Sequence, residues 1–438
     1  MIAAAISAVA GALVSSLLAC VPGLHVYNIF AVLLLVLYPA PPGIPPEVVL
    51  PFAVGMMVGY AMLNTLPSVL LAAPDESTVF TVLPGQKYLM AGRGYEAVIV
   101  TSVGGLAGLA FLLLVAGPVA PFLLRPIAMV FRPHLHWIVW CVIAFMVMSE
   151  WPKGGRLGNA GPGKFLDAWK STGMGLVTFA LSGLLGFILV YRSPMAPRMA
   201  FQGFMPAFVG LFTVPWLVLN LVCRTEVPPQ STRLNRGLSR DDILHGSLAG
   251  TLGGSFAAFI PAVTGGVGAM LAGHATAMRN DRAFLVSQGA SKLVYYVGAV
   301  LFFCVPGPAL TRGGAAAMLS TICPARTHSD YCLALAAIGF AGAVCALLIR
   351  PLTRAMVGLV SRAGYRVVSC AALFVALAVV LAVTGLPGLC VTLVAAGIGM
   401  MPVVFGSRRM NCLGVILLPI ACNMSGVGPA VASWLRLL

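Results

Sequence analysis

Apolar runs about as long as a membrane-spanning helix recur along the whole chain, and this feature limits the fold more than any other. A helix needs roughly 20 consecutive apolar residues to cross a bilayer. Only 8% of the 438 residues are charged and the mean hydropathy is +1.00, whereas about 25% are charged in an ordinary soluble domain. The sequence therefore predicts an all-α polytopic membrane protein with about 10–14 membrane segments.

Two of the apolar regions are too long for one crossing and are interrupted near their middle. Residues 2–39 are interrupted at Pro22-Gly23, and residues 243–278 are interrupted at Pro261 and at the glycines that follow it. Only a tight turn fits in either interruption. Each region is therefore predicted to be a re-entrant helical hairpin, which enters the membrane and returns to the side from which it came.

The same order of interruptions recurs in the second half of the chain, which indicates an internal repeat. A second interrupted helix follows each hairpin, over 47–84 with a break at Pro74 and over 285–322 with a break at Pro306. Shared order in two halves is the sequence signature of a repeat transporter. We expect a first half over 1–223, a linker over 224–242 and a second half over 243–438.

The distribution of basic residues predicts the orientation of the chain. The net charge is +15, but the basic residues lie between apolar runs, as the positive-inside rule predicts, and not in a nucleic-acid-binding patch. The N-terminus is predicted outside. Residues 2–39 then begin and end outside, whereas residues 243–278 begin and end inside, so the two halves are predicted to be inverted with respect to each other. The loops predicted to be cytoplasmic are 85–95, 150–170, 224–242 and 350–366.

The richest polar segment lies over residues 64–78, where prolines, hydroxyls and two carboxylates interrupt an apolar run. Broken helices expose carbonyl and N–H groups that can bind ions. Asn64 and Ser68 are candidate substrate-binding residues. A polar surface loop, with the two acids at a helix N-terminus, is the alternative. The candidate ion-coupling residues are Asp75, Glu76, Ser77 and Thr78, where Na⁺ could bind at Asp75, Ser77 and Thr78 or the carboxylates could carry a proton.

A second polar segment contains Lys292, which follows Ser291 inside an apolar run. A cation in such a run is costly and is usually paired or functional. Lys292 could neutralise Asp75 or Glu76, attract an anionic substrate, or extend to the membrane interface. Together with Ser291 and Tyr295, it is predicted to bind substrate.

The tips of the two hairpins are the third candidate site. Glycine at a tip permits close approach of a ligand, and a histidine there can titrate near neutral pH or make only a local hydrogen bond. The predicted substrate-binding residues of the tips are Pro22, Gly23, His25 and Asn28 in the first hairpin, and Thr264, Gly265, Gly266 and Gly268 in the second.

Several other functions are excluded or weakly supported. The sequence has no Walker motif and no C-x-x-C pair, so neither an ATPase nor a structural zinc site is indicated. No arrangement of residues typical of a hydrolase is present, so no enzyme and no cofactor other than a coupling Na⁺ or H⁺ is predicted. Cys323 and Cys332 flank one short loop and could form a disulfide if that loop faces outside.

The segment Leu70–Gly85, followed by Ala91-Gly92-Arg93-Gly94, resembles the large permease subunit of the tripartite tricarboxylate transporters. The glycine-rich stretch from Pro261 to Gly273 is similar to its second-half counterpart, and the segments Pro22–Asn28 and Gly273–Thr276 are most similar to an archaeal branch of the family. The resemblance implies a secondary transporter for organic carboxylates, driven by Na⁺ or H⁺. It also implies a small membrane subunit and an extracytoplasmic binding protein as partners.

We therefore hypothesise an ion-coupled permease of the cell membrane that moves a di- or tricarboxylate by alternating access. A hairpin-bearing part would move against a scaffold formed by 173–223 and 368–438. A flippase for an anionic lipid carrier such as polyprenyl phosphate is the alternative. An intramembrane enzyme or a non-transporting partner protein is a less supported alternative. The oligomeric state is open, and a homodimer is one option.

Overall fold

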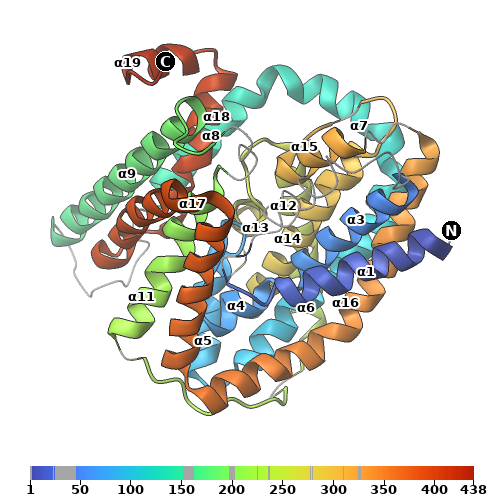
Figure 1. Cartoon of the computed structure of the whole chain (residues 1–438), viewed down its shortest axis with the longest axis horizontal. Helices are drawn as coiled ribbons and strands as arrows, with labels where there is room; N and C mark the ends of the chain where they lie inside the picture. The colour runs from blue at the N-terminus through green and yellow to red at the C-terminus, as the bar shows by residue number, and fades with distance from the viewer. Residues whose placement is uncertain are drawn as a thin grey trace. The chain divides into compact units, whose positions relative to one another are not determined.

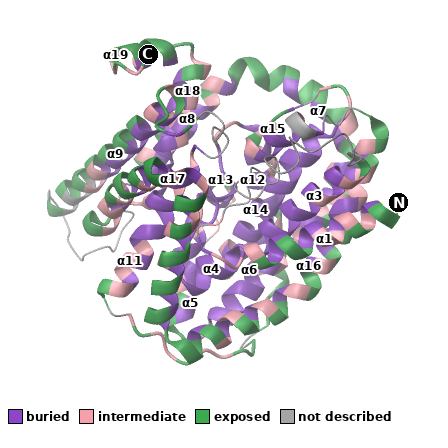
Figure 2. Cartoon of the chain, viewed as in Figure 1, coloured by how far each residue is buried: buried purple, intermediate pink, exposed green. Residues whose placement is uncertain are grey.

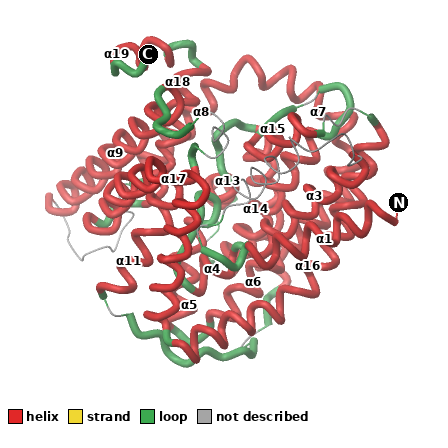
Figure 3. Tube along the Cα trace, viewed as in Figure 1, coloured by secondary structure: helices red, strands yellow, loops and turns green. Residues whose placement is uncertain are grey.

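The computed structural model consists of helices and the loops that join them (Figures 1 and 3). All secondary structure in the described part of the chain is helical, as the sequence predicts. The described residues are 2–22, 24, 46–150, 162–196, 203–223, 225–234, 237–276, 278, 280–308, 310–323 and 327–438.

The chain forms two compact units. Unit 1 is Met1–Arg132 with Leu217–Val379, and unit 2 is Pro133–Trp216 with Val380–Leu438. Unit 2 therefore contains most of the scaffold predicted from the sequence. The predicted halves on either side of 224–242 are repeats in the sequence and differ from these two compact units. The repeat stays a prediction.

Unit 1 contains the helices that carry the predicted site. Three helices contain residues of both units, namely η3 (Arg132–His134), α11 (Val214–Val222) and α17 (Tyr365–Phe405). The helices wholly in unit 1 are α1 (Ile2–Leu18), α3 (Pro46–Leu63), α4 (Thr65–Leu70), η1 (Val79–Thr81), α5 (Val82–Met90), α6 (Gly94–Phe111), η2 (Leu112–Ala116), α7 (Gly117–Phe131), α12 (Arg240–Phe259), α13 (Gly265–Ala275), α14 (Asp281–Phe303), α15 (Gly313–Ile322) and α16 (His328–Ala363).

Seven helical segments among the described residues are long and apolar enough to cross a membrane, or eight with the bent pair Arg409–Met424 and Gly428–Trp434. Two of the seven have room for two crossings of about 20 residues each. These are Gly94–Met148, with 55 residues, and Tyr365–Phe405, with 41 residues and non-helical backbone at Gly385. The chain is therefore a multi-pass membrane protein.

Helix pairing in unit 1 follows a reciprocal pattern. Helix α1 packs on α3, and α12 packs on α14. Each of these pairs is joined by one helix from the other half of the sequence: α16 packs on α3, and α6 packs on α14. Helices α3 and α14 are therefore covered on several sides, and Figure 2 shows both as mostly buried.

The helices are interrupted where the prolines predict interruptions. Residues 71–78 separate α4 from η1, residues 260–264 separate α12 from α13, and residues 304–312 separate α14 from α15. Two alanines in these breaks have left-handed backbone, Ala72 with φ 53° and Ala262 with φ 61°. Such backbone is uncommon for a residue with a side chain and marks a constrained turn.

The first predicted hairpin is only partly within the described residues. Helix α1 ends at Leu18 and a turn follows as far as Pro22. Residues 25–45, which include the predicted return arm with His25 and Asn28, lie outside the described residues, as does Gly23. The predicted break at Pro22 is therefore seen, and the hairpin over 2–39 stays a prediction.

Unit 2 is held together by a buried carboxylate as well as by apolar packing. It contains α8 (Leu135–Met148), α9 (Pro162–Tyr191), α10 (Met205–Phe208), η5 (Val209–Thr213), η6 (Arg409–Leu413), α18 (Gly414–Met424) and α19 (Gly428–Trp434). Glu150, which is 3% exposed, accepts hydrogen bonds from the Arg408 backbone N–H at 2.7 Å and from Asn411 Nδ2 at 2.6 Å. These bonds fix the turn between α17 and α18.

The cysteines make no disulfide. All eleven are free thiols, with Cys323 buried and Cys332 exposed.

The contact between α6 and α14 depends on glycine, which gives a test of the packing. A Cβ atom on Gly289 would lie 1.8 Å from the carbonyl oxygen of Thr101, whereas one on Gly339 of α16 would meet nothing within 4 Å. We expect Gly289→Ala to destabilise the protein by about 1–3 kcal/mol, because the two backbones must separate. Gly339→Ala should leave stability unchanged or raise it by up to about 1 kcal/mol. Thermal unfolding in detergent measures both, and equal melting temperatures would contradict the packing.

Candidate functional site

Asp75 organises the break between α4 and η1. Its Oδ1 atom accepts the backbone N–H groups of Ser77 at 3.0 Å and Thr78 at 2.8 Å, and the hydroxyls of the same two residues at 2.8 Å each. Ser77 and Thr78 lie outside any helix, and in a membrane protein an unsatisfied N–H group costs several kcal/mol. The carboxylate therefore holds the turn closed.

The other oxygen of Asp75 ties this turn to α3. Oδ2 accepts the Tyr60 hydroxyl at 2.7 Å and Asn64 Nδ2 at 2.8 Å. Tyr60 and Asn64 are four residues apart, so they lie on one face of the helix end. The turn is joined to α4 as well, because Ser68 Oγ donates to Thr78 Oγ1 at 2.8 Å.

Lys292 of α14 contacts the same region from the other half of the sequence. Its side chain is buried, with the residue 2% exposed, and its ammonium donates to Asn64 Oδ1 and to Thr65 Oγ1. Asn64 therefore accepts from Lys292 with its oxygen and donates to Asp75 with its nitrogen. A buried cation and a partly buried carboxylate are thus linked through one amide.

Tyr296, one turn after Lys292, positions the second acid. Its hydroxyl lies 2.9 Å from Glu76 Oε1, 3.1 Å from Ser77 Oγ and 3.5 Å from Asp75 Oδ2. Its ring meets the Tyr60 ring edge-on, with the centroids 5.7 Å apart. Glu76 is 2% exposed, so both acids of the segment are held by tyrosines inside the protein.

The turn between α12 and α13 closes over this cluster. A Cβ on Gly266 would lie 2.6 Å from the carbonyl oxygen of Ser77, and one on Gly265 would lie 2.9 Å from Lys292 Cα. Ser291 Oγ donates to the Gly265 carbonyl at 2.7 Å. Thr264 caps α13 through its side chain. Glycine is required here because backbone from two segments occupies the space of a side chain.

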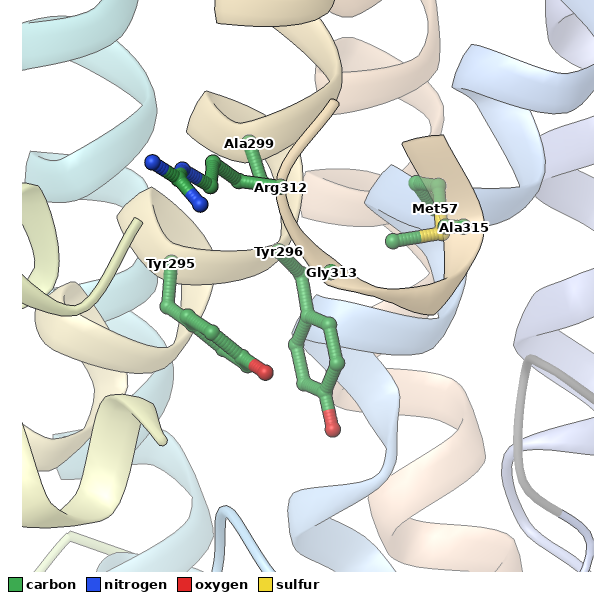
Figure 4. A pocket seen from close by; sticks show the side chains of 7 residues that line it. All are labelled: Met57, Tyr295, Tyr296, Ala299, Arg312, Gly313 and Ala315. Atoms are coloured by element: carbon green, nitrogen blue, oxygen red, sulfur yellow. The ribbon is translucent and has the colours of Figure 1, made fainter. Parts of the chain in front are cut away.

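A small cavity lies beside the cluster, at the break between α14 and α15 (Figure 4). Its volume is about 10 Å³, close to the smallest space that holds one water molecule. Arg312 is the N-cap residue of α15, and its buried Nε has no hydrogen-bond partner among the described residues. The cavity lining is Met57, Tyr295, Tyr296, Ala299, Arg312, Gly313 and Ala315.

The structure brings most of the predicted site residues together. Pro22 is buried in the turn after α1 and makes none of the hydrogen bonds described above, Gly268 packs against Gly253 of α12, and Tyr295 lines the cavity. Gly23, His25 and Asn28 lie outside the described residues. The predicted residues that meet in one cluster are Asn64, Ser68, Asp75, Glu76, Ser77, Thr78, Thr264, Gly265, Gly266, Ser291 and Lys292.

Four residues of this region were not named as site residues from the sequence. Tyr60 and Arg312 lie outside the predicted polar segments, whereas Thr65 and Tyr296 lie inside them. Two of them carry a helical signal, because Tyr60 precedes Asn64 by four residues and Tyr296 follows Lys292 by four. Arg312 carries a different signal, since it is the only basic residue between Pro306 and the next apolar run. Thr65 has no signal beyond its place next to Asn64.

The fold and the buried site define a polytopic membrane protein of the transporter type. A sequence model of the tripartite tricarboxylate transporter TctA family matches residues 5–414, so the chain belongs to that family. The family is the membrane permease component of tripartite transporters, and its members are transporters and not enzymes.

One relative agrees with the predicted similarity to archaeal members. The chain is 26% identical over 295 residues to the uncharacterized protein MJ1079 of Methanocaldococcus jannaschii, over 66% of this chain and 67% of that protein. No solved structure matches.

The hydrogen bonds of the two acids predict different effects on stability. Asp75→Asn keeps the shape of the side chain but removes its charge and turns an amide N–H₂ toward existing donors. We expect it to cost about 2–4 kcal/mol, because several charge-assisted bonds are weakened together. Glu76→Gln keeps an acceptor for Tyr296 and should cost less than about 1 kcal/mol. Thermal unfolding in detergent compares the two, and equal losses would show that Asp75 does not hold the turn.

Proposed function

We propose that this protein is an ion-coupled secondary transporter that moves a small organic anion, a di- or tricarboxylate, across the membrane by alternating access. The observation that carries the proposal is the meeting of helix breaks from both halves of the sequence around buried charges. Asp75 and Glu76 come from the first half, and Lys292 comes from the second. Charged groups inside membrane segments are costly, so membrane proteins keep them mainly where they bind a substrate or an ion.

Arg312 and the start of α15 supply the attraction for a carboxylate. The first turn of a helix carries free N–H groups and a partial positive charge that favour an anion. Arg312 adds a guanidinium that can bind a carboxylate with two parallel hydrogen bonds. The neighbouring cavity holds about one water molecule, so the helices around it must separate before a carboxylate can enter.

The proposed movement uses the division into two units. Unit 1 carries the breaks and the buried charges, and unit 2 is proposed as the scaffold. The reciprocal pairing of α1 with α3 and α12 with α14 supports two related halves, which we propose to be inverted. The N-terminus is then outside and the basic loops 85–95, 150–170, 224–242 and 350–366 are cytoplasmic.

The family suggests the partners of the transporter. We propose that a small membrane subunit and an extracytoplasmic binding protein deliver substrate to it, as in a tripartite system. A homodimer is also proposed, and cross-linking in membranes checks both arrangements.

Counterflow in proteoliposomes tests the proposed function, because exchange needs neither an ion gradient nor a delivery protein. We expect liposomes loaded with citrate or succinate to accumulate the same labelled compound, and liposomes without protein not to do so. Lys292→Met should reduce exchange at least about tenfold, because it removes the cation that compensates Asp75 through Asn64; a tenfold loss corresponds to about 1.4 kcal/mol. Absence of exchange for every carboxylate tested, together with saturable binding of polyprenyl phosphate, would favour a lipid flippase instead.

Arg312 gives a second, independent prediction for the same assay. Arg312→Gln should raise the KM for carboxylate exchange about tenfold, because one charge-assisted pair is worth roughly 1.5–3 kcal/mol. Arg125→Gln is the matched control, since Arg125 is exposed on α7 and should leave KM unchanged. An unchanged KM in Arg312→Gln would remove this residue from the substrate path.

A further inference from the structure

The oxygen atoms that could bind a sodium ion in this site already surround a cation. Lys292 donates to the side-chain oxygens of Asn64 and Thr65, which both lie at the junction of α3 and α4. A break between two helices, lined by amide and hydroxyl oxygens, is the type of place where transporters bind Na⁺. Here the ammonium of the protein itself occupies that place.

The oxygens of Asp75, Ser77 and Thr78, which the sequence predicts as a sodium site, are engaged in hydrogen bonds with one another. The hydroxyls of Ser77 and Thr78 both donate to Asp75 Oδ1, so their hydrogens point at the carboxylate. Thr78 Oγ1 also accepts the Ser68 hydroxyl and the Asp75 backbone N–H. A Na⁺ ion at Asp75, Ser77 and Thr78 would have to break this turn, and its hydrogen bonds are what closes the break.

Charge balance agrees with this assignment. Asp75 Oδ2 receives Tyr60 and Asn64, and Asn64 connects it directly to the Lys292 ammonium. The negative charge of Asp75 is thus compensated by a cation one amide away. Addition of Na⁺ would place a second positive charge beside Lys292 in a low-dielectric region, where like charges repel strongly.

We propose that Lys292 is a tethered cation that takes the place of the coupling Na⁺, so that the site binds no sodium. This inference rests on the proposed transport function for its meaning, but it concerns ion binding alone and can fail separately. It leaves the proton as the coupled ion. The titratable group joined to Lys292 is Asp75, through Asn64. Tyr60 and Tyr296 contact Asp75 in turn, Glu76 contacts Tyr296, and Arg312 lies at the cavity that Tyr296 also lines.

The other helices packed on this part of α14 bring small or neutral groups. Gly104 and Thr101 of α6 contact the α14 backbone, and Gly254 of α12 contacts Ser291. Gly265 of α13 rests on Lys292 itself. Among the described residues around Lys292, the compensating negative charge therefore comes from the break that contains Asp75.

Equilibrium binding of ²²Na⁺ to the purified full-length protein in detergent tests the proposal without any substrate. We expect no saturable ²²Na⁺ binding by the wild type. Lys292→Ala leaves Asn64 and Thr65 oxygens facing an empty space and should gain saturable binding, at least about tenfold above wild type at the same concentration. NaCl should also raise the melting temperature of this variant above its value in choline chloride.

Matched variants separate a cation site from a general effect of the substitution. Lys292→Met fills the space with an apolar chain of similar length and should bind no Na⁺, and Lys292→Arg keeps the charge and should bind none either. Saturable Na⁺ binding by the wild type that Asp75→Asn or Lys292→Met abolishes would overturn the proposal. Lack of Na⁺ binding by a folded Lys292→Ala protein would overturn it as well.

Transport distinguishes failure of this inference from failure of the proposed function. Carboxylate counterflow that is the same in Na⁺ and in choline supports both. Counterflow that requires Na⁺ refutes the tethered cation and keeps the transporter. Absence of counterflow together with the predicted ²²Na⁺ result refutes carboxylate transport and keeps the tethered cation.

Discussion

The constraint behind this structure is that an interrupted helix inside a membrane must find hydrogen-bond partners within the protein. Water is excluded from the hydrocarbon region, and each backbone N–H left unpaired there costs several kcal/mol. Asp75 meets this requirement at the break over residues 71–78, where one carboxylate oxygen accepts two backbone N–H groups and two hydroxyls. The charge that closes the turn then needs compensation, and Lys292 supplies it through Asn64.

Close backbone packing makes this compensation geometrically possible. Helix α14 approaches α6 at Gly289, and the turn between α12 and α13 approaches Ser77 at Gly266. At both places a carbonyl oxygen occupies the space that a Cβ would need. Small residues of this kind let membrane helices pack without a hydrophobic driving force between them. They also bring Lys292, which lies far along the chain, to the end of α3.

The charges of the site divide into two groups with different consequences. Asp75, Asn64 and Lys292 form a closed network in which donors and acceptors are matched, and such a network fixes one arrangement. Arg312 lies at a cavity with an unpartnered buried Nε, so it retains hydrogen-bonding capacity for an anion. A transporter needs a rigid network that fixes its structure and also free hydrogen-bonding groups that can bind and release a substrate.

The sequence by itself determined the class of fold, the places where helices break and many of the residues that meet. Apolar run length follows from bilayer thickness, and proline lacks the N–H that a continuous helix requires, so both can be recognised along a single segment. The breaks at Pro74, Pro261 and Pro306 are therefore found where the sequence predicts them. The inverted relation of the halves stays a prediction.

Tertiary structure alone decided what each polar group does. From the sequence, Asp75 was a candidate sodium ligand and Lys292 had three open roles, because partners of a side chain can lie more than 200 residues away. Only packing shows that Asn64 accepts a hydrogen bond from Lys292 and donates one to Asp75. It also shows that the Tyr296 hydroxyl bonds to Glu76. The physical reason is the separation of the interacting groups along the sequence. Helix breaks are set by neighbouring residues, whereas charge compensation inside a membrane depends on which distant segments meet in space.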